Sequence, residues 1–157
     1  DLQDIKFESN SFDAILCCNV IEHAADPDSL VRECLRILKP GGRLTLITNN
    51  AISRGHDRFK EHWRGLEIPR HLQIFTPASL KQFVKQIGFL SVRSRGCLQG
   101  IYYMWDASAI HEKDGTFNLP PVTKWSRIRA RLKSFTSGIK MILAPGKEES
   151  ILLYAEK

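Results

Sequence analysis

A polar and aromatic stretch, residues 49–75, holds most of the side chains that could carry out chemistry in this chain. It contains three of the five histidines, together with a tryptophan and several arginines. An imidazole can take up a proton near neutral pH, and a guanidinium can bind a phosphate or a carboxylate. Because connections of this length are often binding loops, we predict that residues 49–75 form a substrate loop. The candidate substrate contacts are His56, His62, Trp63, Arg70 and His71.

His71 is the first candidate among them for a base or for a hydrogen bond to substrate, because it stands in PRHLQIF directly before a strand-like run. It could equally be a structural histidine that ties down the loop. Arg70 has a similar alternative, since a single arginine is more often a surface charge than a clamp for an anion.

A second polar group follows an apolar run, AILCC at residues 14–18. Cys18 and Asn19 stand at the end of this run, and open α/β sheets bind ligands at the carboxyl ends of their strands. Asn19 is therefore a candidate rim residue, whereas the cysteines could belong entirely to the core. Glu22 and His23 follow, and we predict that His23 begins a helix and borders the site.

The elements that must position these residues follow a strand, helix, strand order. Residues 11–20 are predicted to form a buried parallel strand, since their apolar run shows no alternation. Asp26 and Pro27 are typical of a helix start. A Pro-Gly-Gly turn at residues 40–42 is predicted to end this helix, and a strand follows at 43–48. This βαβ unit indicates an α/β fold with a mostly parallel sheet.

Four further elements are predicted along the rest of the chain. The patterns favour a helix over 76–87, a strand over 89–95, a helix over 122–143 and a final strand over 150–156. Residues 97–121 receive no regular element. With 157 residues, 43% of them hydrophobic, the chain is predicted to form part of one domain.

Five stretches in this order resemble class I S-adenosylmethionine-dependent methyltransferases. They are the opening DLQDIKF, the run FDAIL, the IEH after it, RILKPGG, and the later WRGLEIPRHLQIF, which is similar to members that modify small molecules, sugars and lipids. The closing ILLYAEK resembles the family's final antiparallel strand. The resemblance implies a partial Rossmann-like fold, in which residues 1–157 form the C-terminal part of one methyltransferase domain.

The same resemblance implies S-adenosyl-L-methionine as the cofactor. It assigns the adenine contact to Asp1 and Leu2, and the methionine side to Cys18 and Asn19. The family's glycine-rich cofactor turn does not occur in these 157 residues, so we expect this chain alone to be inactive. Some relatives in quinone biosynthesis hold a divalent metal through a glutamate three residues before their Glu-His pair. Asn19 takes that position here, and we predict no metal.

The implied reaction is methyl transfer to a small-molecule, sugar or lipid-like acceptor. Transfer from a sulfonium centre is an in-line displacement, which depends on holding the nucleophile within about 3–3.5 Å of the methyl group. A base is needed only when an O–H or N–H group must lose its proton. His71 and His23 are the residues that we assign to this catalytic role.

The excess of positive charge lies in one segment. The net charge is +6, and residues 115–147 contain seven lysines and arginines and no acidic residue. Within this segment, 122–143 is predicted to be an amphipathic helix, part of an insertion or lid over 96–147 that covers the substrate pocket. The alternative is a non-catalytic membrane-surface or interaction module whose helix lies on anionic lipid. A basic segment alone supports only non-specific contact with nucleic acid, so no specific nucleic-acid partner is predicted.

Composition limits where the protein could work. Its four cysteines lack CxxC spacing and are predicted to be reduced thiols in a cytoplasmic protein. No apolar run reaches the roughly 18 residues that a membrane-spanning helix needs. A sheet that is only half of a domain would expose a strand edge, so we also expect the chain either to self-associate or to cover that edge.

The membrane alternative makes a direct prediction. If residues 122–143 lie on lipid, changing both Trp125→Ser and Phe135→Ser should sharply reduce co-sedimentation with anionic liposomes, because these aromatic side chains supply the apolar contact. Unchanged co-sedimentation would argue for the lid.

Overall fold

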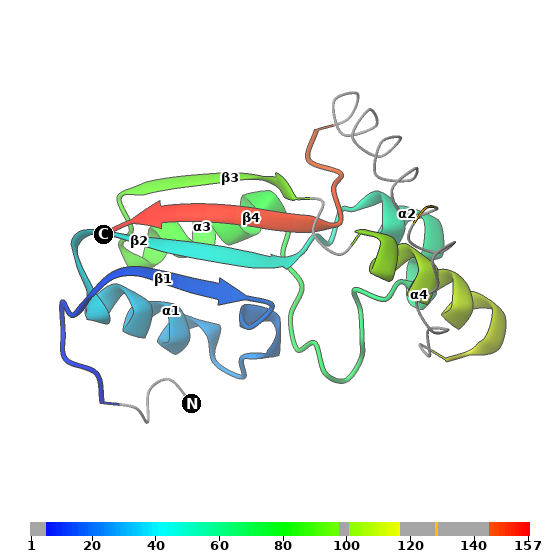
Figure 1. Cartoon of the computed structure of the whole chain (residues 1–157), viewed down its shortest axis with the longest axis horizontal. Coiled ribbons are helices and arrows are strands. Elements are labelled where there is room, and N and C mark those ends of the chain that lie inside the picture. Colours follow the sequence, from blue (N-terminus) through cyan, green and yellow to red (C-terminus); the bar gives the residue numbers. More distant parts are fainter. Residues whose placement is uncertain (1–5, 98–100, 117–127, 129–144) are drawn as a thin grey trace.

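The computed structural model describes residues 6–97, 101–116, 128 and 145–157 of the chain (Figure 1). In chain order, the elements are β1 (Phe12–Cys18), η2 (Ile21–His23), α1 (Pro27–Ile37), β2 (Leu38–Asn49), α2 (Arg54–Phe59), η3 (Lys60–His62), α3 (Pro77–Ile87), β3 (Ser91–Cys97), α4 (Ile101–Asp114) and β4 (Ser150–Glu156). Within these described residues, none of the helices has both the length and the apolar character needed to span a membrane.

Two sequence predictions fall outside the described residues. They are the adenine contact of Asp1 and Leu2, and the basic helix over 122–143, of which only Ile128 is described. The lid assigned to 96–147 stays a prediction. α4 forms within this range.

The four strands form one mixed sheet in the order β1-β2-β4-β3. β1 pairs with β2 in parallel, and β4 lies antiparallel between β2 and β3. β1, β2 and β3 therefore run in the same direction, and the last strand runs against them. This arrangement confirms the α/β class, with a mostly parallel sheet and an antiparallel final strand.

The starts of two helices follow the local sequence. Asp26 caps α1 through its side chain, which accepts a hydrogen bond from the backbone N–H of Ser29 (3.1 Å). At α3, Thr76 and Ser79 form a capping box, and Gly88 ends the helix with a φ of 122°. Both helices confirm the sequence prediction.

One boundary differs from the prediction. α1 ends at Ile37 and β2 begins at Leu38, so residues 40–42 lie in the first part of β2 and not in a turn between elements. The pairing with β1 is irregular at this end of the strand, where the register shifts between Phe12 and Ala14. Such irregular pairing lets a strand accommodate the Pro-Gly-Gly sequence.

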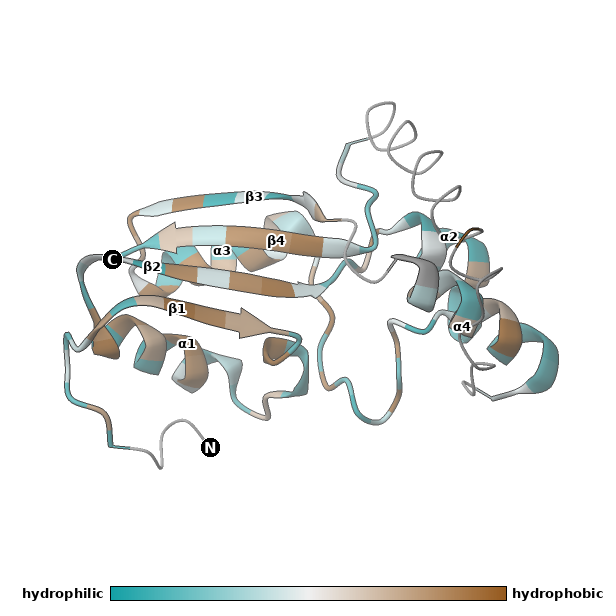
Figure 2. Ribbon diagram, viewed as in Figure 1, coloured by the Kyte–Doolittle hydropathy of each residue, from teal (hydrophilic) through white to brown (hydrophobic). Residues whose placement is uncertain are grey.

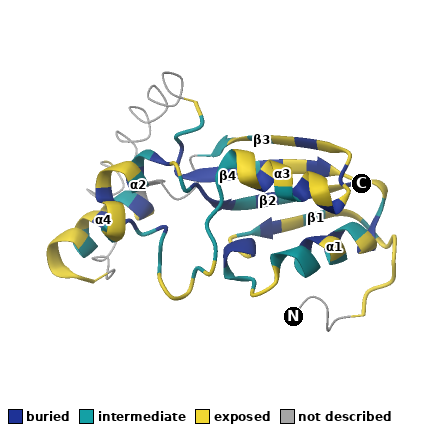
Figure 3. Ribbon diagram, turned by 180° about the vertical axis from the view of Figure 1, so that it is seen from behind, coloured by how far each residue is buried: buried dark blue, intermediate teal, exposed yellow. Residues whose placement is uncertain are grey.

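The main core lies between the sheet and the helices α1 and α3, which cover the same face (Figure 3). Hydrophobic residues run along the central strands β2 and β4 (Figure 2), and Leu44 and Leu46 of β2 are fully buried. Successive strand residues point to opposite faces, so β1 buries Cys17 but leaves Leu16 66% exposed. The prediction that β1 is buried on both faces is therefore wrong for the described residues, because α1 and α3 cover only one of them.

A second group of helices lies beyond the end of the sheet (Figure 1). Residues 49–75, predicted as a loop, contain α2 and η3, and α4 forms within the stretch that received no element. The sequence does not predict α4, because its first residues are mostly apolar or aromatic and its last are mostly polar, without a one-sided stripe. A cluster of Phe59, Trp63 and Met104 packs α4 against α2 and the chain after η3.

The packing of β2 can be tested by comparing two leucines. Leu46→Ala should lower the free energy of unfolding by about 2–5 kcal/mol, because it leaves a cavity in the core. Leu90→Ala is the matched control, since Leu90 is 79% exposed and its loss should cost about 0.5 kcal/mol or less. Urea denaturation followed by circular dichroism measures both, and equal losses would contradict the packing described.

Candidate functional site

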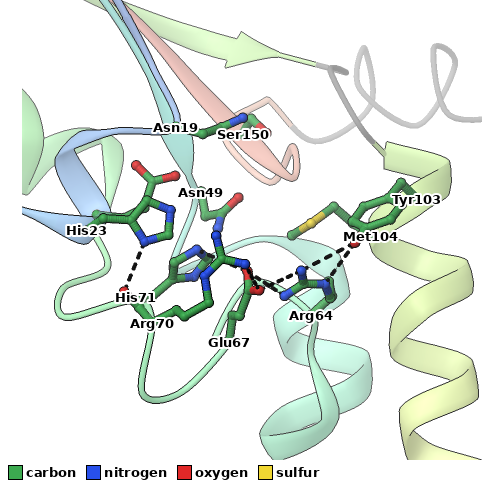
Figure 4. A pocket seen from close by; sticks show the side chains of 11 residues that line it. Asn19, His23, Asn49, Arg64, Glu67, Arg70, His71, Tyr103, Met104 and Ser150 are labelled. Carbon is green, nitrogen blue, oxygen red and sulfur yellow. Dashed lines mark hydrogen bonds and ion pairs between the residues drawn. The ribbon is translucent and has the colours of Figure 1, made fainter. Parts of the chain in front are cut away.

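A cavity of about 360 Å³ opens at the carboxyl ends of β1 and β2 (Figure 4). Because these strands are parallel, Asn19, which follows β1, and Asn49, which ends β2, reach the same edge of the sheet. β4 runs in the opposite direction, so its first residue, Ser150, joins them. The lining residues are Asn19, Glu22, His23, Asn49, Arg64, Glu67, Arg70, His71, Tyr103, Met104 and Ser150.

The turn after β1 places Asn19 at the pocket. Its φ is 53°, a left-handed conformation that asparagine adopts more readily than most residues, and its N–H donates to the carbonyl oxygen of Ile47 (2.8 Å). Cys18 is half-buried and is not among the lining residues. The structure therefore brings one of the two described cofactor candidates to the pocket.

His23 and His71 face one another in the pocket, with ring centroids 4.7 Å apart. Nδ1 of His23 lies 2.9 Å from the carbonyl oxygen of Arg70, and Nδ1 of His71 lies 2.7 Å from that of Gly65. A carbonyl oxygen only accepts, so in each ring Nδ1 carries the proton that is donated. In the neutral form, Nε2 of each ring is then the atom that can accept a proton or bind a cation.

The carbonyl of Gly65 fixes the orientation of His71. It also accepts a hydrogen bond from Nδ2 of Asn49 (3.4 Å), so it links the substrate loop to the end of β2. A Cβ atom at position 65 would lie 2.3 Å from the Trp63 ring. Only glycine therefore allows the chain to pass this close to the tryptophan and still reach both side chains.

A charged network forms the outer part of the pocket (Figure 4). The Glu67 carboxylate accepts hydrogen bonds from Arg64 and Arg70, each 2.7 Å long, and lies 3.4 Å from Nε2 of His71. The guanidinium of Arg64 also donates to the hydroxyl of Tyr103 (3.3 Å). Burial is the largest single influence and would raise the pKa of Glu67, but Arg64, Arg70 and His71 together outweigh it, so the pKa of Glu67 is lowered. The carboxylate stays ionised at neutral pH and can stabilise a positive charge on His71.

Glu22, His23 and His71 also form a potential metal-binding group. Each offers one ligand atom, and these atoms all lie within 4.8 Å of one another. Glu22 is 1% exposed, and its Oε2 accepts a hydrogen bond from the Thr48 hydroxyl (2.8 Å). The ligand set is one carboxylate and two imidazoles, and a backbone carbonyl orients each imidazole. Such a set is suitable for Zn²⁺ or another divalent transition metal. The sequence did not indicate this set, because His71 comes from a different segment.

Trp63 has a structural position and does not line the pocket. It is completely buried, and its indole N–H donates to the Glu149 carboxylate (3.0 Å). The substrate contact predicted for Trp63 therefore has no support in the structure, which places this side chain in the cluster with Phe59 and Met104. In sequence, a tryptophan within a polar stretch looks like a substrate-binding residue. In the structure, the Trp63 side chain is buried in the protein interior.

His56 and His62 also lie outside the set of residues that line the pocket. His56 stacks on Trp63, with centroids 4.9 Å apart, and its Nδ1 bonds to the carbonyl oxygen of Ala51 (2.6 Å). His62 packs against His111 of α4. Of the predicted substrate contacts, Arg70 and His71 reach the pocket. Glu22 lines the pocket beside His23, the residue that it precedes in the predicted Glu-His pair. Six further lining residues were not predicted from the sequence: Asn49, Arg64, Glu67, Tyr103, Met104 and Ser150. Of these, the Arg64 and Glu67 pair carried a local signal, its three-residue spacing.

Comparison with known sequences gives one family. Residues 1–93 match the family model described as a methyltransferase domain. Ubiquinone biosynthesis O-methyltransferases of Xanthomonas oryzae pv. oryzae (strain PXO99A) and Xanthomonas axonopodis pv. citri (strain 306) are 49% and 46% identical, each over 43 residues. Each match covers 27% of this chain and 18% of the relative, so the similarity spans only a small part of those enzymes.

Solved structures share the fold at low identity. A SAM-dependent methyltransferase from Thermotoga maritima matches with a TM-score of 0.61 at 16% identity, over 99% of this chain and 61% of that one. Phosphoethanolamine N-methyltransferase 2 of Haemonchus contortus, in complex with S-adenosyl-L-methionine, matches with a TM-score of 0.54 at 18% identity, over 100% and 36%. The chain thus spans less than two thirds of either protein.

The Glu67 network predicts a specific pH dependence. The folded-state pKa of Glu67 is lowered, so its stabilising contribution is present above its unfolded pKa and is lost as pH falls through the folded value. The difference in free energy of unfolding between wild type and Glu67→Gln should be largest near pH 7 and should shrink below about pH 4. Glu61→Gln is the control, because the side chain of Glu61 is 78% exposed. Denaturant titrations at several pH values measure the difference, and a pH-independent gap would contradict the network.

Proposed function

This chain belongs to the methyltransferase domain family, and from that membership we propose that it binds the acceptor in an S-adenosylmethionine-dependent methyl transfer to a small molecule. The observation that carries the proposal is the pair His23 and His71, with both Nδ1 atoms held by backbone carbonyls at the carboxyl edge of the sheet. We assign residues 1–157 to the C-terminal part of one methyltransferase domain.

The proposed chemistry needs little more than orientation and one proton transfer. When bound, S-adenosylmethionine supplies the methyl group as an electrophile. We assign Asn19, which lines the pocket at the sheet edge, to the methionine part of the cofactor. Nε2 of His71 would take the proton from the acceptor's O–H or N–H group as the acceptor atom bonds to the methyl carbon, the carbon–sulfur bond breaks and S-adenosylhomocysteine leaves. The Gly65 carbonyl accepts the hydrogen bond from Nδ1 on the other side of the His71 ring, and the Glu67 carboxylate stabilises the imidazolium that results.

The group of Glu22, His23 and His71 supports a second way of activating the same acceptor. A divalent cation held by these three residues would polarise an acceptor hydroxyl and lower its pKa. The base and the cation use the same histidine, so they are alternatives for one site. They differ in whether a chelator removes activity.

The test measures S-adenosylhomocysteine formed by the full-length protein with a panel of phenolic, amine and sugar acceptors. His71→Gln should lower kcat by about 100-fold or more, because general-base catalysis contributes at least this much. Binding of S-adenosylmethionine, measured by calorimetry, should change less than about twofold. His62→Gln is the matched control, since His62 lies outside the pocket lining and should leave kcat within about twofold of wild type.

The outcomes separate the alternatives. Activity that survives a chelator but is lost in His71→Gln indicates the base, whereas loss with the chelator and recovery with Mn²⁺ or Zn²⁺ indicates the cation. A full-length protein that binds no S-adenosylmethionine and methylates no acceptor would contradict the proposed function. An equal loss of kcat in His62→Gln would instead assign the acceptor contact to His62.

A further inference from the structure

Glu149 is a buried carboxylate with an unusual set of partners. The residue is 1% exposed, and it accepts hydrogen bonds from the backbone N–H of Gly55 (2.8 Å) and from the indole N–H groups of Trp105 (2.9 Å) and Trp63 (3.0 Å). An ionised carboxylate can only accept, and all three partners are donors. No ion pair found among the described residues includes Glu149. Neutral N–H groups therefore compensate for its burial.

Both indoles stand next to residues that line the pocket. Trp63 directly precedes Arg64, and Trp105 directly follows Met104. Glu149 itself precedes Ser150, which lines the pocket from the sheet. One carboxylate thus joins the start of β4 to α4 and to the chain after η3.

Other contacts hold α4 to the substrate loop. The Ser108 hydroxyl accepts the backbone N–H of Arg64 (2.8 Å), and Glu112 pairs with Arg58 of α2 (2.8 Å). These bonds join α4 to residues 54–64, so α4, α2 and the chain after η3 form one outer unit. Through its two indoles, this unit is bonded to the residue that leads into β4.

Gly55 shows how closely the carboxylate is seated. A Cβ atom at this position would lie 2.4 Å from Oε2 of Glu149. The carboxylate can approach the backbone N–H only because residue 55 has no side chain. Gly55→Ala therefore offers a way to displace the carboxylate without removing its charge.

We propose that Glu149 is a positioning residue, whose carboxylate sets the separation between the sheet side of the pocket and α4 and thereby the fit of the acceptor. The three hydrogen bonds are the physical basis, because each ties a different segment to one point. Only the last step, that this pocket receives the acceptor, rests on the proposed function. The junction itself can be tested without any activity.

The first experiment follows the indole N–H signals by ¹H–¹⁵N NMR. In wild type, Trp63 and Trp105 should give signals that exchange slowly with water. In Glu149→Gln the amide replaces one acceptor oxygen by a donor, so at least one of the two signals should exchange about tenfold faster or more. Glu148→Gln is the matched control, since Glu148 is adjacent and 7% exposed and neither of the two described indoles donates to it. Unchanged exchange in Glu149→Gln would overturn the proposal.

The second experiment separates positioning from stability through steady-state kinetics with the acceptor that is most active in wild type. Glu149→Gln and Gly55→Ala should each raise the acceptor KM about tenfold, while S-adenosylmethionine affinity and kcat change less than about threefold. Trp105→Phe removes one donor of the three and should show a smaller rise. If Glu149→Gln does not fold, Gly55→Ala and Trp105→Phe decide the question.

The failures of the two proposals can be told apart. Folded variants that lose indole protection but keep the wild-type acceptor KM would show that Glu149 supports the structure alone, which overturns the positioning role. A wild-type protein that shows slow indole exchange but transfers no methyl group would contradict the proposed function and leave the junction in place. A parallel fall of kcat and S-adenosylmethionine affinity would also count against a role confined to the acceptor.

Discussion

The parallel pairing of β1 with β2 is the constraint on which the rest of the pocket depends. α1 returns the chain between these strands, so both end at the same edge of the sheet. Asn19, Glu22 and Asn49 therefore meet there although they belong to different segments. β4 enters the sheet beside β2 in the opposite direction, which adds Ser150 at the same edge. The directions of the strands therefore account for the half of the pocket that the sheet forms.

The other half depends on buried polar contacts. The carbonyl of Gly65 fixes His71, and the carboxylate of Glu149 ties Trp63 and Trp105 to the start of β4. A buried polar group is costly when a partner is lost, so these bonds specify one arrangement of the loop. The helices that form this side pack on one another through a small cluster separate from the main core. Their position is therefore easier to alter than that of the sheet.

Electrostatics connect the two halves. Glu67 accepts hydrogen bonds from two arginines and lies beside His71, while Glu22 lies near both pocket histidines. The Glu67 carboxylate offsets the charges of Arg64 and Arg70, and the neutral imidazoles present Nε2 as the atom that can accept a proton or bind a cation. Proton transfer or cation binding is thus the chemistry that this pocket favours. Whether the pocket transfers a proton or binds a cation depends on whether a proton or a metal ion binds the Nε2 atoms of His23 and His71.

The residues alone predict the βαβ unit, the capped helices and the place of Asn19 at the end of the first strand, because caps and apolar runs act between neighbours in the chain. They also indicate His71 and Arg70 from their place before a strand-like run. The fold was needed to show that Trp63 is buried and that α4 forms. It was also needed to show that Glu149 bonds to residues of other segments. These outcomes depend on contacts between residues far apart in the chain, which no local pattern records.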